Sequence, residues 1–282
     1  MNNKKKLSAY AGIRELAKNG GINHAFNLSR MCAYDGIELL FLTNECDNII
    51  SEAKLYSSAI SSCEIKVVCI SCFADLVTKS EPYSVDTASV EAIKKCIDLA
   101  EKIGCPYVHH TIVTRLIGSR DDYDKVLPIA ISSAGEIASY AKSRGIDIIY
   151  EPQGMLFNGN AGYSAFFDLM RMHHENVGIC LDVGNTLWVD EDCYLLAEKY
   201  AEYIKHVHLK DYIIGSDNEG YKTLGGSSIK EVKIGNGVID FFRVFKILEG
   251  TGYNGYISIE DNSNPDFETT AKESRNFLEN LP

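Results

Sequence analysis

The stretch GIDIIYEPQGMLFNGNAGYSAFFDLMRMHHENVGICLDVGN, residues 145–185, contains two strand-like runs separated by a helix-like run. GIDIIYEP (145–152) and VGICLDVGN (177–185) are short apolar runs that each end in polar residues, which is typical of buried strands. SAFFDLMRMHH (164–174) lies between them and predicts a helix. The stretch therefore predicts a strand–helix–strand unit, the connection that joins parallel strands.

The same alternation continues in both directions along the chain, with a strand-like run roughly every 30 residues. Strands are predicted at 6–12, 36–43, 64–73, 106–113, 145–152, 177–185, 205–211 and 255–261, and helices at 22–34, 48–63, 85–104, 123–145, 164–174, 192–204, 239–252 and 267–280. Eight such units predict a single (β/α)8 TIM barrel of the α/β class, formed by one domain over residues 1–282. The alternative is an open doubly wound sheet, but AYAGIREL, which includes the end of the first strand, lacks the G-x-G-x-x-G fingerprint that such a sheet prefers.

The composition disfavours several classes of function. Hydrophobic residues make up 45% of the chain and charged residues 24%, an ordinary globular balance. The formal net charge of −11 argues against nucleic acid as the main partner, because phosphate binding needs a basic surface. No apolar run approaches the roughly 20 residues of a membrane span. The basic start MNNKKKLSAY has no apolar stretch behind it, so we expect no signal peptide and a cytoplasmic protein.

The nine cysteines fit a set of reduced thiols, because their number is odd and no secretory signal is present. Cys69 and Cys72 form a C-x-x-C pair inside VVCISCF. Positions three apart in a strand face opposite sides, and no second pair follows. We therefore expect buried structural thiols here and no metal or redox site.

Four polar residues lie at the ends of four consecutive predicted strands: Glu151, Asp182, His208 and Glu260. Because side chains alternate between the two faces of a strand, each shares its face with the residue two positions earlier, and the residues between are apolar. The inward set then also contains Ile149, Cys180, His206, Ser258 and Lys210, and the outward set contains Ile148, Tyr150, Ile179, Leu181, Val207, Leu209, Ile257 and Ile259. Barrel enzymes carry their sites at these strand ends, so we expect the four residues to meet there.

Three carboxylates at one point would repel one another, and a divalent cation removes that cost. A mainly oxygen ligand set with one imidazole suits Mn²⁺, Mg²⁺ or Co²⁺, and Zn²⁺ is also allowed. Each residue alone is explained as well by a helix cap, a turn or a solvated loop. The shared direction of all four favours a metal site.

The segments IIYEPQG (148–154), GICLDVGNTLW (178–188), IKHVHLKDY (204–212) and KIGNGVIDFFRVFKILEGTGYNGYISIE (233–260) resemble the xylose isomerase-like TIM barrels. That superfamily includes sugar and sugar phosphate isomerases and epimerases, inosose dehydratases and endonuclease IV. The resemblance is clear over residues 146–261, and the first part of the chain shares only the strand–helix rhythm.

The resemblance implies that Glu151, Asp182, His208 and Glu260 bind one divalent metal and that the two glutamates also move the proton. The implied activity is a metal-dependent sugar or sugar phosphate isomerase or epimerase. In such a reaction a 2-keto sugar chelates the metal, and a metal-stabilised enediolate forms when a C–H proton leaves. One glutamate takes the proton, and the other returns it to the opposite face of the same carbon; its return to the adjacent carbon gives isomerisation.

Departures from the family pattern bear on the rival activities. Many relatives carry a histidine three residues after the strand-six aspartate, whereas this chain has Asn185, which can hold a sugar hydroxyl but weakens any proton role. The three-zinc endonuclease arrangement also needs a histidine after the third strand and an Asp-x-His before KIGNG, where this chain has CISCF and SSIKEV. Together with the acidic charge, this disfavours a nuclease. Dehydration of an inosose and non-catalytic binding of a sugar with a metal remain alternatives.

Several further residues are candidates near the site. His206, one layer below His208, is expected to support it by hydrogen bonding and not to bind the metal. Lys210 either meets a substrate oxygen or phosphate or pairs with a ligand carboxylate. One of His109 and His110 must face the barrel interior, where it contacts substrate or fills the core.

The remaining candidates lie in loops. Trp188 could wall the site, and Asn158 and Asn160 either shape their loop or bind sugar. Asp211 is expected to form a turn. Gly235 and Gly237 are explained by a close approach of the backbone before a helix that Asp240 caps. A nucleotide-binding role is not required to explain the two glycines. The expected partner is a small sugar, and a homo-oligomer is compatible with the sequence.

Overall fold

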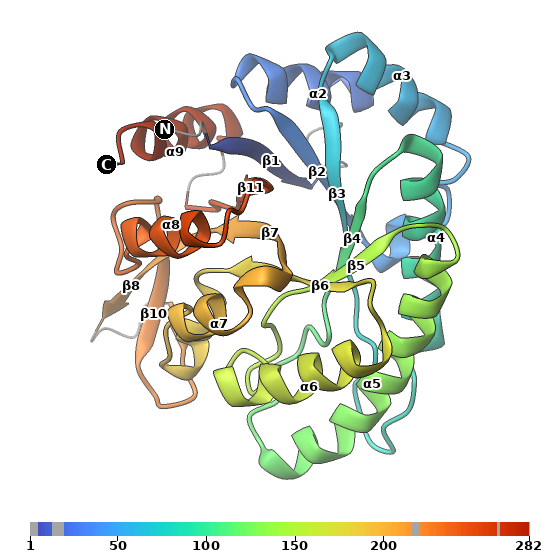
Figure 1. Ribbon diagram of the computed structural model, residues 1–282, viewed down its shortest axis with the longest axis vertical. Helices are drawn as coiled ribbons and strands as arrows, with labels where there is room; N and C mark the ends of the chain where they lie inside the picture. The colour runs from blue at the N-terminus through green and yellow to red at the C-terminus, as the bar shows by residue number, and fades with distance from the viewer. Residues whose placement is uncertain (1–4, 13–19, 216–219, 264–265, 282) are drawn as a thin grey trace.

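The computed structural model describes residues 5–12, 20–215, 220–263 and 266–281. Eight parallel strands close into a barrel in the order β1-β11-β7-β6-β5-β4-β3-β2 (Figure 1). They are β1 Lys6–Gly12, β2 Gly36–Leu42, β3 Lys66–Phe73, β4 Tyr107–His110, β5 Asp147–Tyr150, β6 Val177–Asp182, β7 Ile204–Leu209 and β11 Tyr256–Ile259. Because β1 pairs with both β2 and β11, the described sheet has no free edge, and the predicted (β/α)8 barrel is confirmed.

Helices connect successive strands and surround the barrel (Figure 1). The described helices are α2 Gly21–Met31, α3 Ala53–Cys63, α4 Thr87–Ile103, α5 Arg120–Lys142, α6 Asn160–His173, α7 Tyr194–Lys199, α8 Phe241–Gly250 and α9 Phe267–Glu279. Short 3₁₀ turns follow three strand or helix ends: η1 Thr43–Glu45, η2 Asn185–Val189 and η3 Ala201–Tyr203. No described helix is both long and apolar enough to cross a membrane.

Helix α4 shows how the local sequence sets these elements. Asp86 caps its start by accepting a hydrogen bond from the Ser89 backbone N–H at 3.0 Å. Val90 and Ile93 begin an apolar stripe that is buried against the barrel. Gly104 ends the helix with φ at +74°, a conformation that costs glycine little.

Helix α5 begins earlier than the sequence predicted. It starts at Arg120 and not at residue 123, because Ser119 caps it and acidic residues occupy its first turn. Pro128 therefore lies inside the helix and does not start it. Helix α3 is shorter than predicted and begins at Ala53, because the chain turns through η1 first.

The predicted alternation of the strands holds in the barrel. Inside, Cys69, Ile149 and Cys180 form a small apolar cluster of their own, with Tyr107 packed against it. The outward residues of β5, β6, β7 and β11 belong to the main core that lies between the strands and the helices. Above the inner apolar cluster the barrel interior is polar, with Ser8, Glu38, Ser71, His109, His206 and Ser258 all buried. A polar interior near one end of the barrel is where a site can be built.

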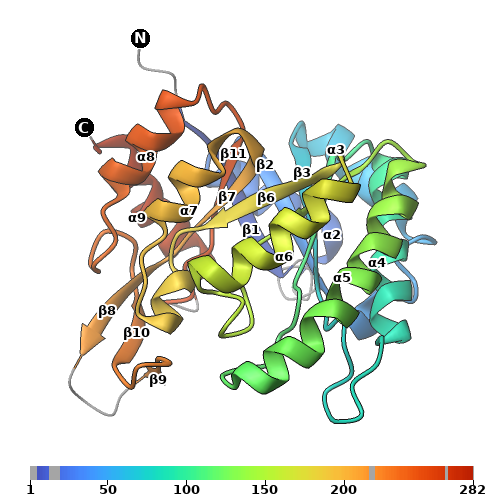
Figure 2. The same ribbon diagram turned by 60° about the horizontal axis from the view of Figure 1, so that its bottom comes forward.

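A small antiparallel sheet follows β7 and was missed by the sequence analysis. It has the order β8-β10-β9, formed by Asp211–Gly215, Ser228–Val232 and Tyr221–Lys222. Figure 2 shows β8, β9 and β10 beside the barrel, below α7 and α8 in that view. These strands are short and half polar, so their pattern is weak.

Asp211 links the segment that follows β10 to the end of β7, so its role is larger than the turn that the sequence predicted. It is fully buried and accepts hydrogen bonds from the backbone N–H groups of Gly235, Gly237 and Ile239. A Cβ atom on Gly237 would lie 2.1 Å from Asp211 Oδ1. The close approach to Asp211 therefore explains this glycine, and Asp240 caps α8 as expected by accepting from Arg243 N at 3.0 Å.

Candidate functional site

The four polar strand ends meet at the C-terminal end of the barrel. Glu151 directly follows β5, Asp182 ends β6, His208 lies next to the end of β7 and Glu260 directly follows β11. One potential ligand atom from each residue lies within 4.8 Å of the others. Glu151, Asp182 and His208 are buried, and Glu260 is partly exposed. The convergence expected from the strand alternation is therefore present.

His208 points its two ring nitrogens at different carboxylates. Nδ1 lies 3.1 Å from Glu151 Oε2 and 3.5 Å from Glu260 Oε2. Nε2 lies 3.0 and 3.1 Å from the two carboxylate oxygens of Glu38. A metal-binding histidine usually donates its other N–H to a carboxylate, which fixes the tautomer and orients the ring. The arrangement leaves Nδ1 as the available ligand atom.

Glu38 is the main residue of this site that the sequence analysis missed. It lies in the middle of β2 and is fully buried. Beside His208 it contacts His206 Nε2 at 2.8 Å and accepts hydrogen bonds from the hydroxyls of Ser258 and Ser71. Burial raises the pKa of Glu38, but the charges of His208 and His206 and their hydrogen bonds outweigh it and hold the pKa well below its usual range. Glu38 is therefore a fixed carboxylate beneath the four-residue group.

His206 lies one layer below His208, as its spacing predicted. Its Nε2 is 2.8 Å from both Glu38 Oε2 and Ser258 Oγ. His206, Glu38 and His208 also form a compact group of potential ligands, but imidazole and serine groups already contact both oxygens of Glu38. The contacts of His206 are thus those of a residue that holds Glu38 in place.

Lys210 lies among the carboxylates. Its Nζ is 2.9 Å from Asp182 Oδ2 and 2.9 Å from Glu260 Oε1, and 3.4 Å from Asn185 Oδ1. Burial lowers the pKa of Lys210, but Asp182 and Glu260 raise it well above its ordinary value. The other oxygen of Asp182 accepts hydrogen bonds from the backbone N–H groups of Gly184 and Asn185 at 2.8 and 2.7 Å. The structure thus shows the salt bridges of Lys210 with these carboxylates, and its contact with a substrate oxygen or phosphate stays a prediction.

The two glutamates of the group titrate in opposite directions. Burial raises the pKa of Glu151, but the charges of His109 and His208 and a hydrogen bond from His208 lower it to about 2. Burial raises the pKa of Glu260 to about 7; the charge of Lys210 lowers this pKa, and the charge of Asp182 raises it. Two carboxyl groups whose surroundings separate their pKa values are typical of an acid and a base in one site.

His109, and not His110, faces the site. His109 Nδ1 lies 3.0 Å from Ser71 Oγ, its Nε2 lies 3.7 Å from Glu151 Oε1, and burial lowers its pKa to about 4. The Nε2 atom is buried and has no hydrogen-bond partner within the described part of the chain, so it is available to a substrate oxygen. His110 lies on the other side of β4, with its ring 4.8 Å from the Tyr150 ring.

Tyr10 is a second residue that the sequence analysis did not single out. It lies near the end of β1, and its ring meets the His208 ring edge-on at 5.1 Å. Burial raises the pKa of Tyr10 well above its ordinary value, and Glu260 adds to the effect. Its hydroxyl therefore stays protonated beside the carboxylates and can donate a hydrogen bond.

The loop candidates divide into supporting and available groups. Asn158 donates from Nδ2 to the backbone oxygen of Asn185 at 2.6 Å, and Asn160 pairs with Glu191. The Asn185 Nδ2 group is buried, and no described residue offers it a hydrogen-bond partner, so it is available to a ligand. Trp188 lies in η2 with its ring 4.9 Å from the Tyr221 ring, at the side of the small sheet.

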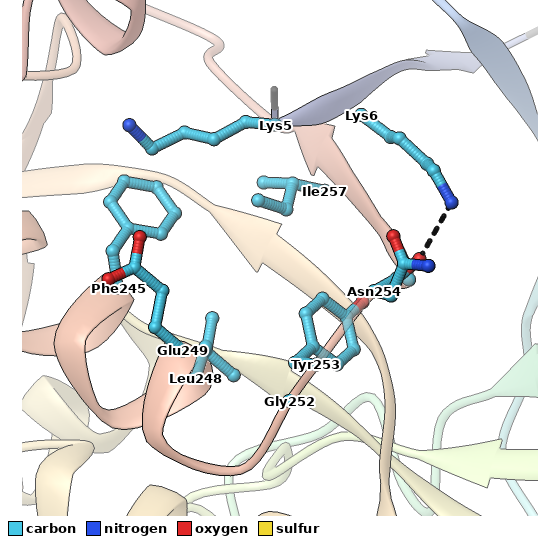
Figure 3. A pocket seen from close by; sticks show the side chains of 10 residues that line it. Lys5, Lys6, Phe245, Leu248, Glu249, Gly252, Tyr253, Asn254 and Ile257 are labelled. Carbon is cyan, nitrogen blue, oxygen red and sulfur yellow. Dashed lines mark hydrogen bonds between the residues drawn. The ribbon is translucent and has the colours of Figure 1, made fainter. Parts of the chain in front are cut away.

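A hollow of about 250 Å³ lies at the opposite, N-terminal end of the barrel. Figure 3 shows Lys5 and Lys6 on one side of it and Phe245, Glu249 and Tyr253 on the other. Lys6 Nζ donates to the backbone oxygen of Asn254 at 3.0 Å, and Lys5 Nζ lies over the Phe245 ring at 4.8 Å. This hollow lacks the convergent carboxylates, so the candidate site is the other end.

The sequence model of the xylose isomerase-like TIM barrel matches residues 26–281 of this chain. The chain belongs to the xylose isomerase-like TIM barrel family. This match covers all four residues of the group at the strand ends, and it confirms the resemblance found in the sequence.

Three proteins illustrate the family around this chain. An inosose dehydratase of Clostridium beijerinckii is 31% identical over 148 residues, which are 50% of this chain and 48% of the relative. The match thus spans about half the length of this curated relative. The apo 3-keto-D-glucoside 4-epimerase YcjR of E. coli has the same fold, with a TM-score of 0.74, 17% identity and coverage of 98% and 99% of the two chains. The IOLI protein with a binding zinc atom has a TM-score of 0.74, 13% identity and coverage of 98% and 97%.

Proposed function

We propose that this protein is a divalent-metal-dependent isomerase or epimerase of a sugar or sugar phosphate. The observation that carries the proposal is the convergence of two glutamates, Glu151 and Glu260, with Asp182 and His208 at the C-terminal end of the barrel, where one potential ligand atom of each lies within 4.8 Å of the others. Such a pair can take a proton from one side of a carbon and supply one from the other.

The donor chemistry of the group fits a divalent ion. Glu151, Asp182, His208 and Glu260 would hold it through carboxylate oxygens and His208 Nδ1, and their spacing within 4.8 Å supports this. A set of three carboxylates and one imidazole suits Mn²⁺, Mg²⁺ or Co²⁺, and the zinc in the IOLI protein keeps Zn²⁺ as a candidate. When bound, the ion would polarise a substrate carbonyl and offset the negative charge that develops beside it.

The surrounding residues can carry the rest of the reaction. One of the two glutamates, Glu151 or Glu260, would take the proton from the substrate carbon, and the other would return a proton to the opposite face. The buried His109 Nε2 and the Asn185 amide would hold substrate oxygens, because neither has a hydrogen-bond partner among the described residues. Lys210 would keep Asp182 and Glu260 in position through its two ion pairs.

Dehydration of an inosose is the second candidate, and the match to the Clostridium beijerinckii inosose dehydratase favours it. The same groups serve, because one glutamate would take a proton and the other would direct a proton to a departing hydroxyl. A metal-dependent, non-catalytic sugar-binding protein is a third candidate, which the presence of both glutamates disfavours.

One experiment separates these activities. Metal-loaded protein is incubated with a panel of ketoses, ketose phosphates and inososes in heavy water and followed by NMR. Deuterium at a carbon with inverted configuration indicates an epimerase, deuterium at the neighbouring carbon an isomerase, and loss of water a dehydratase. We expect Glu151→Gln and Glu260→Gln to abolish exchange and Glu249→Gln, which changes the hollow at the opposite end, to leave it unchanged. No exchange and no turnover with any sugar that binds would favour the non-catalytic reading.

A further inference from the structure

A second group of potential metal ligands lies outside the barrel, where helix α4 packs against β3 and η1 (Figure 1). Cys46 directly follows η1, Cys72 is next to the end of β3, and Cys96 lies in the middle of α4. Their Sγ atoms lie within 4.8 Å of one another, and those of Cys46 and Cys96 are 3.7 Å apart. All three side chains are buried.

This group is separate from the carboxylates. Cys72 follows Ser71, whose hydroxyl faces the barrel interior and donates to Glu38, so Cys72 points outward to the helices. Cys69, its partner in the C-x-x-C motif, points inward and packs with Ile149 and Cys180. Cys69 and Cys72 therefore face different sides of β3, but Cys72 joins two other cysteines that are distant in the sequence.

The spacing of the three sulfur atoms matches a three-coordinate ion. A thiolate bond to an ion such as zinc is about 2.3 Å long, so three sulfurs in a plane around one ion are about 4 Å apart. The observed 3.7 Å between Cys46 and Cys96 is close to this value, and the third sulfur lies within 4.8 Å of both. Small side-chain movements would complete the triangle.

The type of ligand decides the type of ion. Sulfur ligands without oxygen or nitrogen select soft ions such as Cu(I) over Mg²⁺ or Mn²⁺. Structural Zn²⁺ sites almost always use four protein ligands, and among the described residues this group supplies three. A site of three sulfurs in an apolar layer suits an ion that accepts low coordination.

The charge of the ion also matters in a buried site. Of the ions that thiolate sulfur selects, Cu(I) carries a single positive charge, which limits the net charge that the ion and its ligands place in the core.

A hollow of about 360 Å³ lies near the cluster. Its lining includes Thr43 and Asn44 of η1, Phe73 of β3 and Ser89 of α4, but none of the three cysteines. Phe73 directly follows Cys72, and Thr43 is three residues before Cys46.

We propose that Cys46, Cys72 and Cys96 form a binding site for a soft monovalent cation, of which Cu(I) is the biological example. Binding transfers no electrons, and any S–H proton that the ion displaces passes to solvent. The bland alternative is that the three thiols only fill space as small apolar side chains.

The test is a competition for Cu(I) between the reduced full-length protein and a coloured Cu(I) chelator without oxygen. We expect the protein to withhold one Cu(I) per chain and Cys46→Ala and Cys96→Ala each to lose at least about tenfold in affinity. Cys63→Ala is the matched control, because Cys63 is a buried thiol with a different partner, Asn27. Asp182→Asn should retain Cu(I), which separates this site from the proposed sugar site.

X-ray absorption of the Cu(I)-loaded wild-type protein decides the case even where a cysteine variant fails to fold. We expect three sulfur neighbours at about 2.3 Å. Nitrogen or oxygen neighbours, unchanged retention in a folded Cys46→Ala protein, or no Cu(I) withheld by the wild type would each overturn the proposal.

Discussion

Glu38 controls which nitrogen of His208 is available to a metal ion. The glutamine amide has one oxygen that accepts hydrogen bonds, whereas the Glu38 carboxylate has two. Glu38→Gln should therefore disturb the tautomer and the ring orientation of His208. We expect the metal affinity to fall about 10- to 100-fold, the usual range when such a partner is lost. Calorimetric titration with Mn²⁺ measures this, with Glu249→Gln as the control. An unchanged affinity in a folded Glu38→Gln protein would mean that Glu38 does not act through His208.

The two histidines of β7 should respond differently to removal. His208→Ala deletes a proposed ligand, so metal binding and turnover should both be lost. His206→Ala leaves the four-residue group complete but frees Glu38, so we expect a loss of about 10- to 100-fold. His206→Gln should retain more than His206→Ala, because an amide can still donate to Glu38. If His206→Ala loses the metal as completely as His208→Ala, both imidazoles bind it.

The raised pKa of Glu260 predicts that metal binding depends on pH. Below its pKa of about 7 this carboxyl is protonated in the metal-free protein, and an ion must displace the proton. We expect the proton on this carboxyl to make the affinity rise with pH up to about pH 7, and more protons to be released per ion at pH 6 than at pH 8. Calorimetry in two buffers of different ionisation enthalpy counts the protons. Equal proton release at pH 6 and pH 8 would contradict the assignment.

The same shift has a defined effect on the stability of the metal-free protein. The folded pKa of Glu260 lies above its ordinary value of 4.5, so the folded state holds more protons than the unfolded state between these values. The contribution of this group is therefore fully present below about pH 4.5 and is lost as the pH rises through about 7.

At the scale of elements, the barrel strands could be predicted because each is apolar and bounded by glycine or polar residues. Their alternation also predicted which side chains face inward, and so the convergence of Glu151, Asp182, His208 and Glu260. Glu38 gave no such signal, because it lies inside a strand and not at its end. Its only trace in the sequence is one acidic residue within GIELLFL.

The small sheet and the thiol cluster were missed for a different reason. Strands β9 and β10 are short and partly exposed, so neither has a clear period. Cys46, Cys72 and Cys96 are brought together by the packing of α4 on β3 and η1. Contacts between distant segments produce no recognisable spacing of residues in the sequence. The contact between Tyr10 and His208 was missed for the same reason.

Gly237, in the connection after the small sheet, should not tolerate a larger side chain. A Cβ there would lie 2.1 Å from Asp211 Oδ1 and 2.4 Å from the backbone oxygen of Tyr212. We expect Gly237→Ala to destabilise the protein by about 1–3 kcal/mol, because Asp211 would have to shift away from the N–H groups that it holds. Denaturant unfolding measures the change.

Gly250→Ala is the matched control, because a Cβ at this end of α8 would have no atom within 4 Å from any described residue beyond its chain neighbours and its own helical turn, and the position has no positive φ. This variant should be neutral or slightly more stable, since alanine favours the helix. Equal stability of Gly237→Ala and Gly250→Ala would show that the approach to Asp211 relaxes at little cost.

At the scale of the whole molecule, the formal net charge of −11 disfavours nucleic acid as a substrate. A protein that binds a nucleic acid must neutralise several phosphates with cations, and this chain carries 28 lysines and arginines against 39 acidic residues. A small sugar needs no such surface, because its hydroxyl groups are recognised by a few polar side chains inside a pocket.

The family contains DNA-cleaving members, so a direct test on DNA is informative. β3 ends in CISCF and the segment before KIGNG reads SSIKEV, and Asn185 replaces a histidine, so the chain lacks ligands expected for a three-metal centre. We predict that protein loaded with Zn²⁺ or Mn²⁺ cleaves a duplex with an abasic site no faster than its Glu260→Gln variant. The measurement is gel analysis of a labelled duplex. Rapid metal-dependent incision by the wild type, abolished in Glu260→Gln, would contradict this prediction. It would mean that the single metal-binding group at the strand ends is sufficient for phosphodiester cleavage. The acidic net charge could then no longer be used as an argument for a sugar substrate.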